Sequence, residues 1–168
     1  MYKSGRSASR GFTLVELVLV MIIGGVLAAI AVPRMVDRSA YQTRGGASEV
    51  RTALRYAQRL AMAKNREVCV TTTLLPDLRL TFSSAAAPAT GAACDQLVIR
   101  PGDLVGYVVT PPAGITLTST VPTFRFDGRG RPITTPPNLA LTVPVSFTVG
   151  AAGGSGTISI QPETGYVQ

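Results

Sequence analysis

The chain has 168 residues, two Cys, no His and no Trp, and a formal net charge of +7. This length suits one domain with an appended segment, and it leaves enough residues for a modest hydrophobic core. The lack of His excludes a His-based catalytic triad, and two thiols without His cannot complete a structural zinc site. The composition therefore predicts no enzyme, no metal site and no cofactor.

The positive charge is concentrated in two stretches of the chain. Lys3, Arg6 and Arg10 lie within residues 1–11, which contain no acidic residue. Eight of the sixteen basic residues lie between Arg34 and Arg66. Basic residues in a leader or along a helix raise the pI without a polyanionic partner. The net charge is thus weak support for nucleic-acid binding.

The beginning of the sequence predicts a leader, residues 1–11, followed by a membrane helix, residues 12–33. The apolar run Phe12–Val32 has 21 residues, which is long enough to span a bilayer as a helix. A secretory signal peptide would be cleaved after its apolar run and not before it. The basic leader favours a cytoplasmic start, which places the rest of the chain beyond the membrane.

Glu16 is the single charged residue in this apolar run. A carboxylate in a spanning helix costs roughly 2.5–3.5 kcal/mol on insertion scales unless it is paired, neutralised or close to the interface. Its position alone leaves two interpretations open: a functional acid, or an acid tolerated near the lipid headgroups.

The residues around Glu16 carry a resemblance to a known class of proteins. The sequence Gly11-Phe12-Thr13-Leu14-Val15-Glu16, continuing into an apolar helix, resembles the type IV prepilin processing motif. The resemblance implies that a prepilin peptidase cleaves after Gly11 and methylates the new amino terminus at Phe12. It also implies that Glu16 pairs with the positive terminus of a neighbouring subunit during assembly. Such pairing relieves the cost of burying both charges in a helix bundle.

Pro33 follows the apolar run, and helical periodicity resumes soon after it. Proline removes one backbone hydrogen bond and clashes with the preceding turn of a helix. It can therefore end the spanning helix or kink a longer one. The resumed periodicity and the resemblance to pilins both favour a kink.

Residues 34–66 are predicted to form an amphipathic helix, because apolar residues recur at three- and four-residue steps. Arg51, Arg55 and Arg59 form a regularly spaced basic row on another face. Such a row can bind nucleic acid, but it is more typical of a solvated helix face. Gly45-Gly46 marks a point where we expect the helix to bend or break.

Residues 67–168 are predicted to form an all-β head. Short β-like runs are separated by Gly, Pro, Asp or Asn at turn positions. We expect two small antiparallel sheets packed on the C-terminal half of the helix, which makes the fold class α+β. Gly150–Gly156 lacks the Lys of a phosphate-binding loop and is expected to be a turn. The predicted runs are Val68–Thr73, Leu78–Phe82, Leu97–Ile99, Tyr107–Val109, Ile115–Thr118, Thr123–Phe126, Leu139–Val143, Val145–Val149, Thr157–Ile160 and Gly165–Val167.

Both cysteines, Cys69 and Cys94, lie in the head. In an exported domain a disulfide that closes the loop between them is the favoured interpretation, and two buried free thiols are the alternative. The chain-entropy model gives such a bridge roughly 3–4 kcal/mol of stabilisation. The Ala/Pro/Gly-rich stretch Ser83–Ala93 is expected to be a loop tethered at one end by Cys94.

Three further motifs are similar to those of the H-type pseudopilin and FimT group. Within this group the mannose-sensitive haemagglutinin (MSHA) minor pilins of the C type resemble the chain most. The resemblance extends over nearly the whole chain, most thinly over residues 74–123, and implies the type IV pilin fold. The motifs are Leu54-Arg55-Tyr56-Ala57-Gln58 with Ala61 and Val68-Cys69-Val70, then Phe126-Asp127-Gly128-Arg129-Gly130-Arg131-Pro132, and Glu163-Thr164-Gly165-Tyr166-Val167.

Gly128-Arg129-Gly130-Arg131 has the Gly-Arg-x-Arg spelling that DNA-binding FimT-type pilins carry near the C-terminal end, and Arg125 lies close by. Arginines on a turn can contact phosphates and give salt-dependent binding. The favoured interpretation is instead a tight β-turn in which glycines supply positive φ. DNA contact through Arg125, Arg129 and Arg131 is the rival hypothesis.

Taken together, the motifs predict a minor pilin of an MSHA-like type IV pilus with a priming or tip role. The alternatives are an H-type minor pseudopilin of a type II secretion system and a FimT-like DNA-binding minor pilin. The resemblance implies three partners: prepilin peptidase, other pilins contacted through the N-terminal helix, and an inner-membrane assembly platform. It places the chain in the bacterial inner membrane as a single-pass protein with a periplasmic head, and later in an extracellular pilus or a periplasmic pseudopilus.

Overall fold

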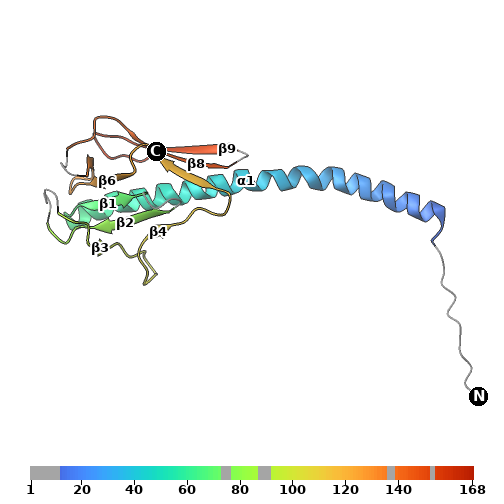
Figure 1. The fold of residues 1–168 in the computed structure, drawn as a ribbon, viewed down its shortest axis with the longest axis horizontal. Helices are drawn as coiled ribbons and strands as arrows, with labels where there is room; N and C mark the ends of the chain where they lie inside the picture. Colours follow the sequence, from blue (N-terminus) through green and yellow to red (C-terminus); the bar gives the residue numbers. More distant parts are fainter. Residues whose placement is uncertain (1–11, 73–76, 87–91, 136–138, 152–153) are drawn as a thin grey trace, which may run out of the picture. The chain divides into compact units, whose positions relative to one another are not determined.

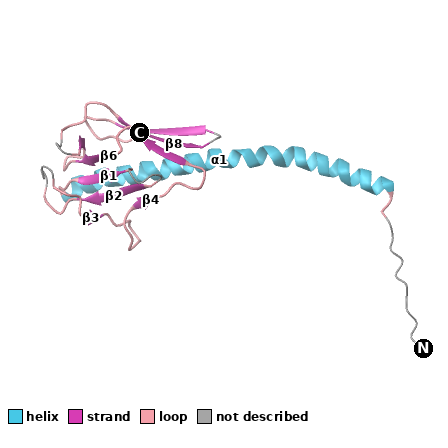
Figure 2. Cartoon of the chain, viewed as in Figure 1, coloured by secondary structure: helices cyan, strands magenta, loops and turns pink. Residues whose placement is uncertain are grey.

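The computed structural model describes residues 12–72, 77–86, 92–135, 139–151 and 154–168, with the backbone alone for residues 31–39. One long helix precedes a series of short strands (Figure 2). The chain forms two compact units, of which the first ends at Arg38 and the second begins at Ser39. The elements are α1 (Leu14–Lys64), β1 (Val68–Thr71), β2 (Leu78–Phe82), β3 (Gln96–Leu97), β4 (Val108–Val109), β5 (Thr116–Ser119), β6 (Thr123–Phe126), β7 (Pro132–Thr134), β8 (Val145–Ala151) and β9 (Gly154–Ile160).

Helix α1 ends at Lys64 because the next residue adopts a left-handed backbone. Asn65 has φ 47°, a conformation that Asn tolerates better than most residues. The amide of Arg66 donates to the carbonyl of Ala61 at 3.2 Å, and that of Asn65 donates to Met62. These two bonds satisfy carbonyls that the helix end would leave unpaired. The chain then turns directly into β1.

Two sites expected to disturb the helix, Pro33 and Gly45-Gly46, lie inside α1. The helix continues past Pro33, so the interpretation that this proline ends the helix is wrong, and the kink stays a prediction. The helix also continues through Gly45-Gly46, so the expected break is absent. A Cβ added at Gly46 would lie 3.3 Å from Cγ1 of Val149. Gly46 therefore serves close packing of α1 on the sheet.

Residues 12–30 are the part of the first unit whose side chains are described. Every large hydrophobic side chain from Phe12 to Ile30 is at least 46% exposed. Within the described part of the chain, no helix is both long enough and apolar enough to cross a membrane.

The larger sheet has β1 at its centre. Among the described residues its strand order is β3-β2-β1-β6-β7, with β4 also paired to β2, and all its pairs are antiparallel. Val70 lies opposite Leu80 on one side and Phe124 on the other. All three side chains are fully buried.

The smaller sheet has the order β5-β8-β9 and is also antiparallel. Strands of both sheets lie alongside the C-terminal part of α1 (Figure 1). One face of this helix enters the core through Ala47, Val50, Ala53, Leu54, Ala57 and Ala61. The predicted α+β architecture, with two antiparallel sheets on the second half of the helix, is confirmed.

Several predicted strand limits are wrong. Pro132–Thr134 forms β7, although its proline and the preceding Gly-Arg run predicted only a turn. The predicted strand Leu139–Val143 contributes one isolated bridge, from Ala140 to Ile133. Strand β8 extends to Ala151, and strand β9 begins at Gly154. Less of the glycine-rich stretch is therefore a turn than expected. A Cβ added at Gly156 would lie 3.3 Å from Cβ of Ala47, so glycine allows β9 to lie close to α1.

Candidate functional site

The start of α1 presents the predicted assembly residues. The amide of Glu16 donates to Oγ1 of Thr13 at 3.3 Å, and the amide of Leu17 donates to the Thr13 carbonyl. Thr13 therefore caps the helix, and the carboxylate of Glu16 lies in the first turn, where the helix dipole favours a negative charge. Glu16 and Phe12 are both exposed. Gly11, the predicted cleavage position, lies outside the described residues together with the leader.

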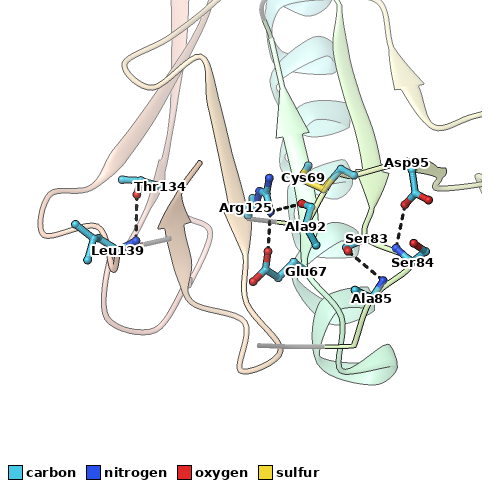
Figure 3. A network of polar contacts seen from close by, with 11 residues as sticks. Glu67, Cys69, Ser83, Ser84, Ala85, Ala92, Asp95, Arg125, Thr134 and Leu139 are labelled. Atoms are coloured by element: carbon cyan, nitrogen blue, oxygen red, sulfur yellow. Dashed lines mark hydrogen bonds and ion pairs between the residues drawn. A yellow bond between two sulfur atoms is a disulfide. The ribbon is translucent and has the colours of Figure 1, made fainter. Parts of the chain in front are cut away.

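The head contains the predicted disulfide between Cys69 and Cys94, whose Cα atoms are 6.3 Å apart. Cys69 lies in β1 at the centre of the larger sheet, and Cys94 lies at the end of the Ala/Pro/Gly-rich stretch. The alternative of two free thiols is therefore wrong. The bridge fixes the segment from Ala92 to Asp95 against the sheet (Figure 3).

A buried ion pair lies beside this disulfide (Figure 3). Nη1 of Arg125 is 2.8 Å from Oε2 of Glu67, and the two side chains are 6% and 3% exposed. The same Nη1 donates to the carbonyl of Ala92 at 2.8 Å. A pair this deeply buried is stable only when further hydrogen bonds offset its lost hydration, and the Ala92 carbonyl supplies one of them.

The position of Arg125 corrects one part of the DNA hypothesis. Its guanidinium was a candidate phosphate contact, but it is buried and paired with Glu67. Arg129 is exposed. Nε of Arg131 lies 3.3 Å from Oδ2 of Asp127, and the Arg131 side chain is part-exposed. The three arginines therefore do not form one surface.

The Gly128–Arg131 run forms a tight turn centred on Asp127. Oδ1 of Asp127 accepts hydrogen bonds from the amides of Arg129 and Arg131 at 2.9 and 2.8 Å. Gly130 has φ 81°, and a Cβ there would lie 3.0 Å from Sδ of Met62. The interpretation as a turn with a glycine at positive φ is confirmed for Gly130.

This turn is also attached to the C-terminal segment through helix α1. Nε2 of Gln58 donates to the carbonyls of Gly130 and Thr164 at 3.2 and 3.0 Å. Gly165 has φ 68°, and a Cβ there would overlap the Gly130 carbonyl oxygen. Only glycine fits at this crossing of two backbone segments.

The basic row of α1 does not form one solvated face. Nε and Nη2 of Arg55 both donate to the carbonyl of Val167, at 3.3 and 3.0 Å. Arg51 is half-buried, and Arg59 is exposed. Arg55 is exposed like Arg59, so the prediction of a solvated row is wrong only for Arg51. Arg55 also attaches the C-terminal segment to the helix.

Sequence reasoning missed Glu67 and the structural role of Arg125. A signal was present, because Arg125 stands between two phenylalanines in a short apolar strand run, where an unpaired charge would be costly. The described residues contain no group of three or more His, Cys, Asp or Glu side chains that could hold a metal ion.

Comparison with known proteins agrees with this geometry. Residues 6–32 match the prokaryotic N-terminal methylation motif, and residues 46–165 match the family described as type II transport protein GspH. In fold, the chain is similar to the type IV minor pilin FimU of Pseudomonas aeruginosa, with a TM-score of 0.51 and 16% identity over 77% of this chain and 88% of that one. It is also similar to the minor pseudopilin EpsH of the Vibrio cholerae type 2 secretion system, with a TM-score of 0.54 and 11% identity over 76% and 94%.

Two curated relatives are similar over part of the chain. The type IV narrow pilus major component PilA5 of Thermus thermophilus is 37% identical over 60 residues, which cover 36% of this chain and 52% of that protein. A fimbrial protein of Pseudomonas aeruginosa is 44% identical over 62 residues, which cover 36% and 40%. The chain thus matches about half or less of the length of these relatives.

The long N-terminal helix, the antiparallel sheets packed on it and the methylation motif define the type IV pilin fold. The relatives are pilin and pseudopilin subunits and not enzymes. Because the match covers residues 46–165, the chain belongs to the type II transport protein GspH family. Its class is accordingly minor pilin or pseudopilin, of a type IV pilus or a type II secretion system.

Proposed function

We propose that the chain is a minor pilin of an MSHA-like type IV pilus, incorporated through the segment Phe12–Val32 and active in filament priming or at the tip. One observation carries the proposal: every large hydrophobic side chain from Phe12 to Ile30 is exposed. A continuous apolar surface of this kind requires cover from lipid or from other chains. Packing among the N-terminal helices of neighbouring subunits supplies such cover.

Processing by prepilin peptidase prepares this segment for assembly. The match of residues 6–32 to the methylation motif supports cleavage after Gly11 and methylation of Phe12. Cleavage creates a positive amino terminus four residues before Glu16. The exposed carboxylate of Glu16 then pairs with the terminus of a neighbouring subunit, since two opposite charges buried together cost less than either charge alone.

Before assembly the subunit is anchored in the inner membrane as a single-pass protein with its head in the periplasm. The apolar sequence of residues 12–32 and the basic leader support this placement. The remaining partners are the other pilins of the filament and an inner-membrane assembly platform. After assembly the head lies on an extracellular pilus.

Intact-mass and N-terminal analysis of the chain from membranes and from sheared filaments tests this proposal. We expect the filament fraction to contain a chain that begins at methylated Phe12. The variant Gly11→Ala should remain uncleaved, while Gly5→Ala, a glycine in the same leader, should be processed normally. A chain that begins at Met1 and occurs only in membranes would contradict the proposal.

A pseudopilin of a type II secretion system is the second candidate, and the family match over residues 46–165 favours it. The two candidates differ in the filament that requires the chain. Deletion of the gene should abolish surface pili and leave secreted enzymes unchanged if the pilus proposal holds. Loss of secretion with normal pili would favour the pseudopilin.

DNA binding has one supporting observation, the exposed side chain of Arg129 on its turn. The test compares the parent chain with Arg129→Gln, both in non-ionic detergent, for their ability to retard a DNA duplex in a gel. The matched control is Arg59→Gln, which removes an equally exposed arginine from α1. Equal retardation by both variants and the parent chain would remove Arg129 as a DNA site.

A further inference from the structure

A pocket of about 360 Å³ opens between α1 and the start of β9. Six of its eight described lining residues are Ala, Gly, Ser or Thr, and the other two are arginines. The helix contributes five residues and the strand three. They are Ala40, Thr43, Arg44, Ala47 and Arg51 from α1, and Gly154, Ser155 and Gly156 from β9.

The described lining of this pocket carries two positive charges and no negative one. Arg44 and Arg51 are seven residues apart and so lie two turns apart on one face of α1. Glu49, the nearest acid on the helix, is engaged elsewhere, with its Oε1 3.3 Å from Nη2 of Arg100. Neither Arg44 nor Arg51 has a recorded ion pair or side-chain hydrogen bond with the described residues.

Arg51 provides the strongest sign of a missing partner. Its Nε atom is buried and has no hydrogen-bond partner among the described residues. A buried donor left unsatisfied costs about 1–3 kcal/mol, and more when the group is charged. The planar guanidinium groups of two arginines bind carboxylates through paired, charge-assisted hydrogen bonds. A carboxylate in the pocket would pair with the guanidinium group of Arg51, which lines it, and neutralise local charge.

The edge of β9 indicates that the carboxylate belongs to a peptide. Ser159 exchanges two backbone hydrogen bonds with Gln168, at 3.1 and 3.0 Å, so its amide and carbonyl point to the outer edge of the sheet. Because this direction alternates along a strand, the amides and carbonyls of Ser155 and Thr157 point to the same edge. Both residues are exposed, and no described residue bonds to their backbone on that side. An extended peptide can pair there.

We propose that this pocket is a docking site for an extended acidic segment of another protein chain. The segment's carboxylate pairs with Arg51 and Arg44, its methylene groups contact Ala40 and Ala47, and its backbone lies near the open edge of β9. The site is independent of the proposed assembly through the N-terminal helix, because all its residues belong to the head unit.

The test uses the full chain in non-ionic detergent and the probe acetyl-Thr-Glu-Thr-Glu-Thr-amide. Nuclear magnetic resonance of the arginine Nε–H groups follows binding. We expect saturable shifts of the Arg51 signal with this peptide and none with the matched peptide in which Gln replaces Glu. The variants Arg51→Gln and Arg44→Gln should each weaken binding by roughly tenfold, the effect of losing one charge-assisted contact. Arg59→Gln, exposed on the same helix, should bind as the parent chain does.

Three results would overturn the proposal. Equal binding of the Glu and Gln peptides would exclude carboxylate recognition. An equal loss in Arg59→Gln would mean that the peptide senses only overall charge. If sodium phosphate shifted the Arg51 signal at the same concentration as the Glu peptide, the site would bind free anions and the peptide partner would be wrong.

Discussion

The first and last thirds of helix α1 are both rich in apolar residues, yet they differ in what covers them. Between Phe12 and Ile30 the apolar side chains are exposed and surround the helix. Between Ala47 and Ala61 they follow one face, and that face is buried against the chain's own two sheets. Apolar residues on all sides require a surrounding medium or several partners, whereas one stripe is satisfied by one surface. The pattern therefore distinguishes a region whose apolar surface is exposed from a region that packs on the chain's own sheets.

The two regions also differ in the surroundings of a carboxylate. Glu16 is exposed, and no described residue pairs with its side chain. Glu67 is 2% exposed and lies 2.8 Å from Arg125. The head supplies the counter-charge of Glu67, whereas no described residue supplies one for Glu16. Five predictions follow from these differences: the first two compare the regions directly, and the other three test what stabilises the head.

The largest effect is expected for Glu67→Ala. It leaves Arg125 buried without its counter-charge, so the free energy of unfolding of the head should fall by roughly 3–5 kcal/mol. Denaturant unfolding of the full chain in detergent, followed by circular dichroism, measures this change. Glu16→Ala is the matched control: it should leave unfolding unchanged while it removes the chain from sheared filaments. Equal stability of the Glu67→Ala variant and the parent chain would contradict the importance of the pair.

Leu54→Ala against Leu17→Ala tests the same contrast with apolar groups. Leu54 is fully buried, so its truncation should lower the free energy of unfolding by roughly 3–5 kcal/mol through lost burial and a cavity. Leu17 is 54% exposed, and its truncation should leave the head's unfolding midpoint in place. A comparable loss in both variants would show that the N-terminal segment is part of the head's folding unit.

The double variant Cys69→Ser/Cys94→Ser removes the bridge across a 25-residue separation. The head should lose roughly 3–4 kcal/mol because the unfolded chain regains its loop entropy. The parent chain treated with reductant is the control and should show the same loss. If the double variant unfolds at the same denaturant concentration as the oxidised parent, the bridge does not stabilise the head.

Gly165→Ala should cost about 2 kcal/mol or more, since a non-glycine residue at positive φ loses roughly 1–2 kcal/mol and the added Cβ overlaps the Gly130 carbonyl oxygen. Gly102→Ala isolates the backbone contribution, because Gly102 has φ 90° and no atom within 4 Å of an added Cβ. Thermal unfolding of the two variants compares them. Equal losses of stability in the two variants would mean that the backbone at Gly130 moves away from the added Cβ without a free-energy penalty.

The smallest effect is expected at Asp95, where the side chain of Gln96 and the backbone of Ser84 donate hydrogen bonds that lower the carboxyl pKa below 3.8. A lowered pKa stabilises the fold above pH 3.8, and this contribution disappears as the pH falls through the folded-state pKa. Asp95→Asn should therefore be slightly less stable than the parent at pH 7, and the difference should shrink below pH 3.8. A difference between the two proteins that stays constant as the pH falls would contradict this prediction.

The sequence allowed much of the fold to be predicted, because the relevant signals are local. The three- and four-residue spacing of Val50, Ala53 and Leu54 predicted the buried face of α1. The disulfide was predicted from two cysteines in a head that we expected to be exported. The motif from Gly11 to Glu16 predicted the class of protein, a type IV pilin-like subunit. Each of these signals depends on neighbours in sequence or on the cellular compartment.

The features that could not be predicted depend on residues distant in sequence. Arg125 and Glu67 are 58 positions apart, and no local pattern indicates which acid faces which arginine. Likewise, the contact of Arg55 with Val167 spans 112 positions. Strand β7 was missed because Pro132 and the preceding glycines are typical of turns, and its pairing with β6 outweighs that preference.

The central place of β1 has a consequence for the order in which the head folds. Its neighbour β2 follows within a few residues, but β6 begins only at Thr123, after Cys94 has been synthesised. Closing a short loop is entropically easier than closing a long one. Oxidation of Cys69 and Cys94 can thus precede the arrival of β6 and hold the Ala92 carbonyl in place. In that order of events Arg125 would meet a carbonyl acceptor already in position, and a covalent bond made earlier would guide the long-range pairing of β1 with β6.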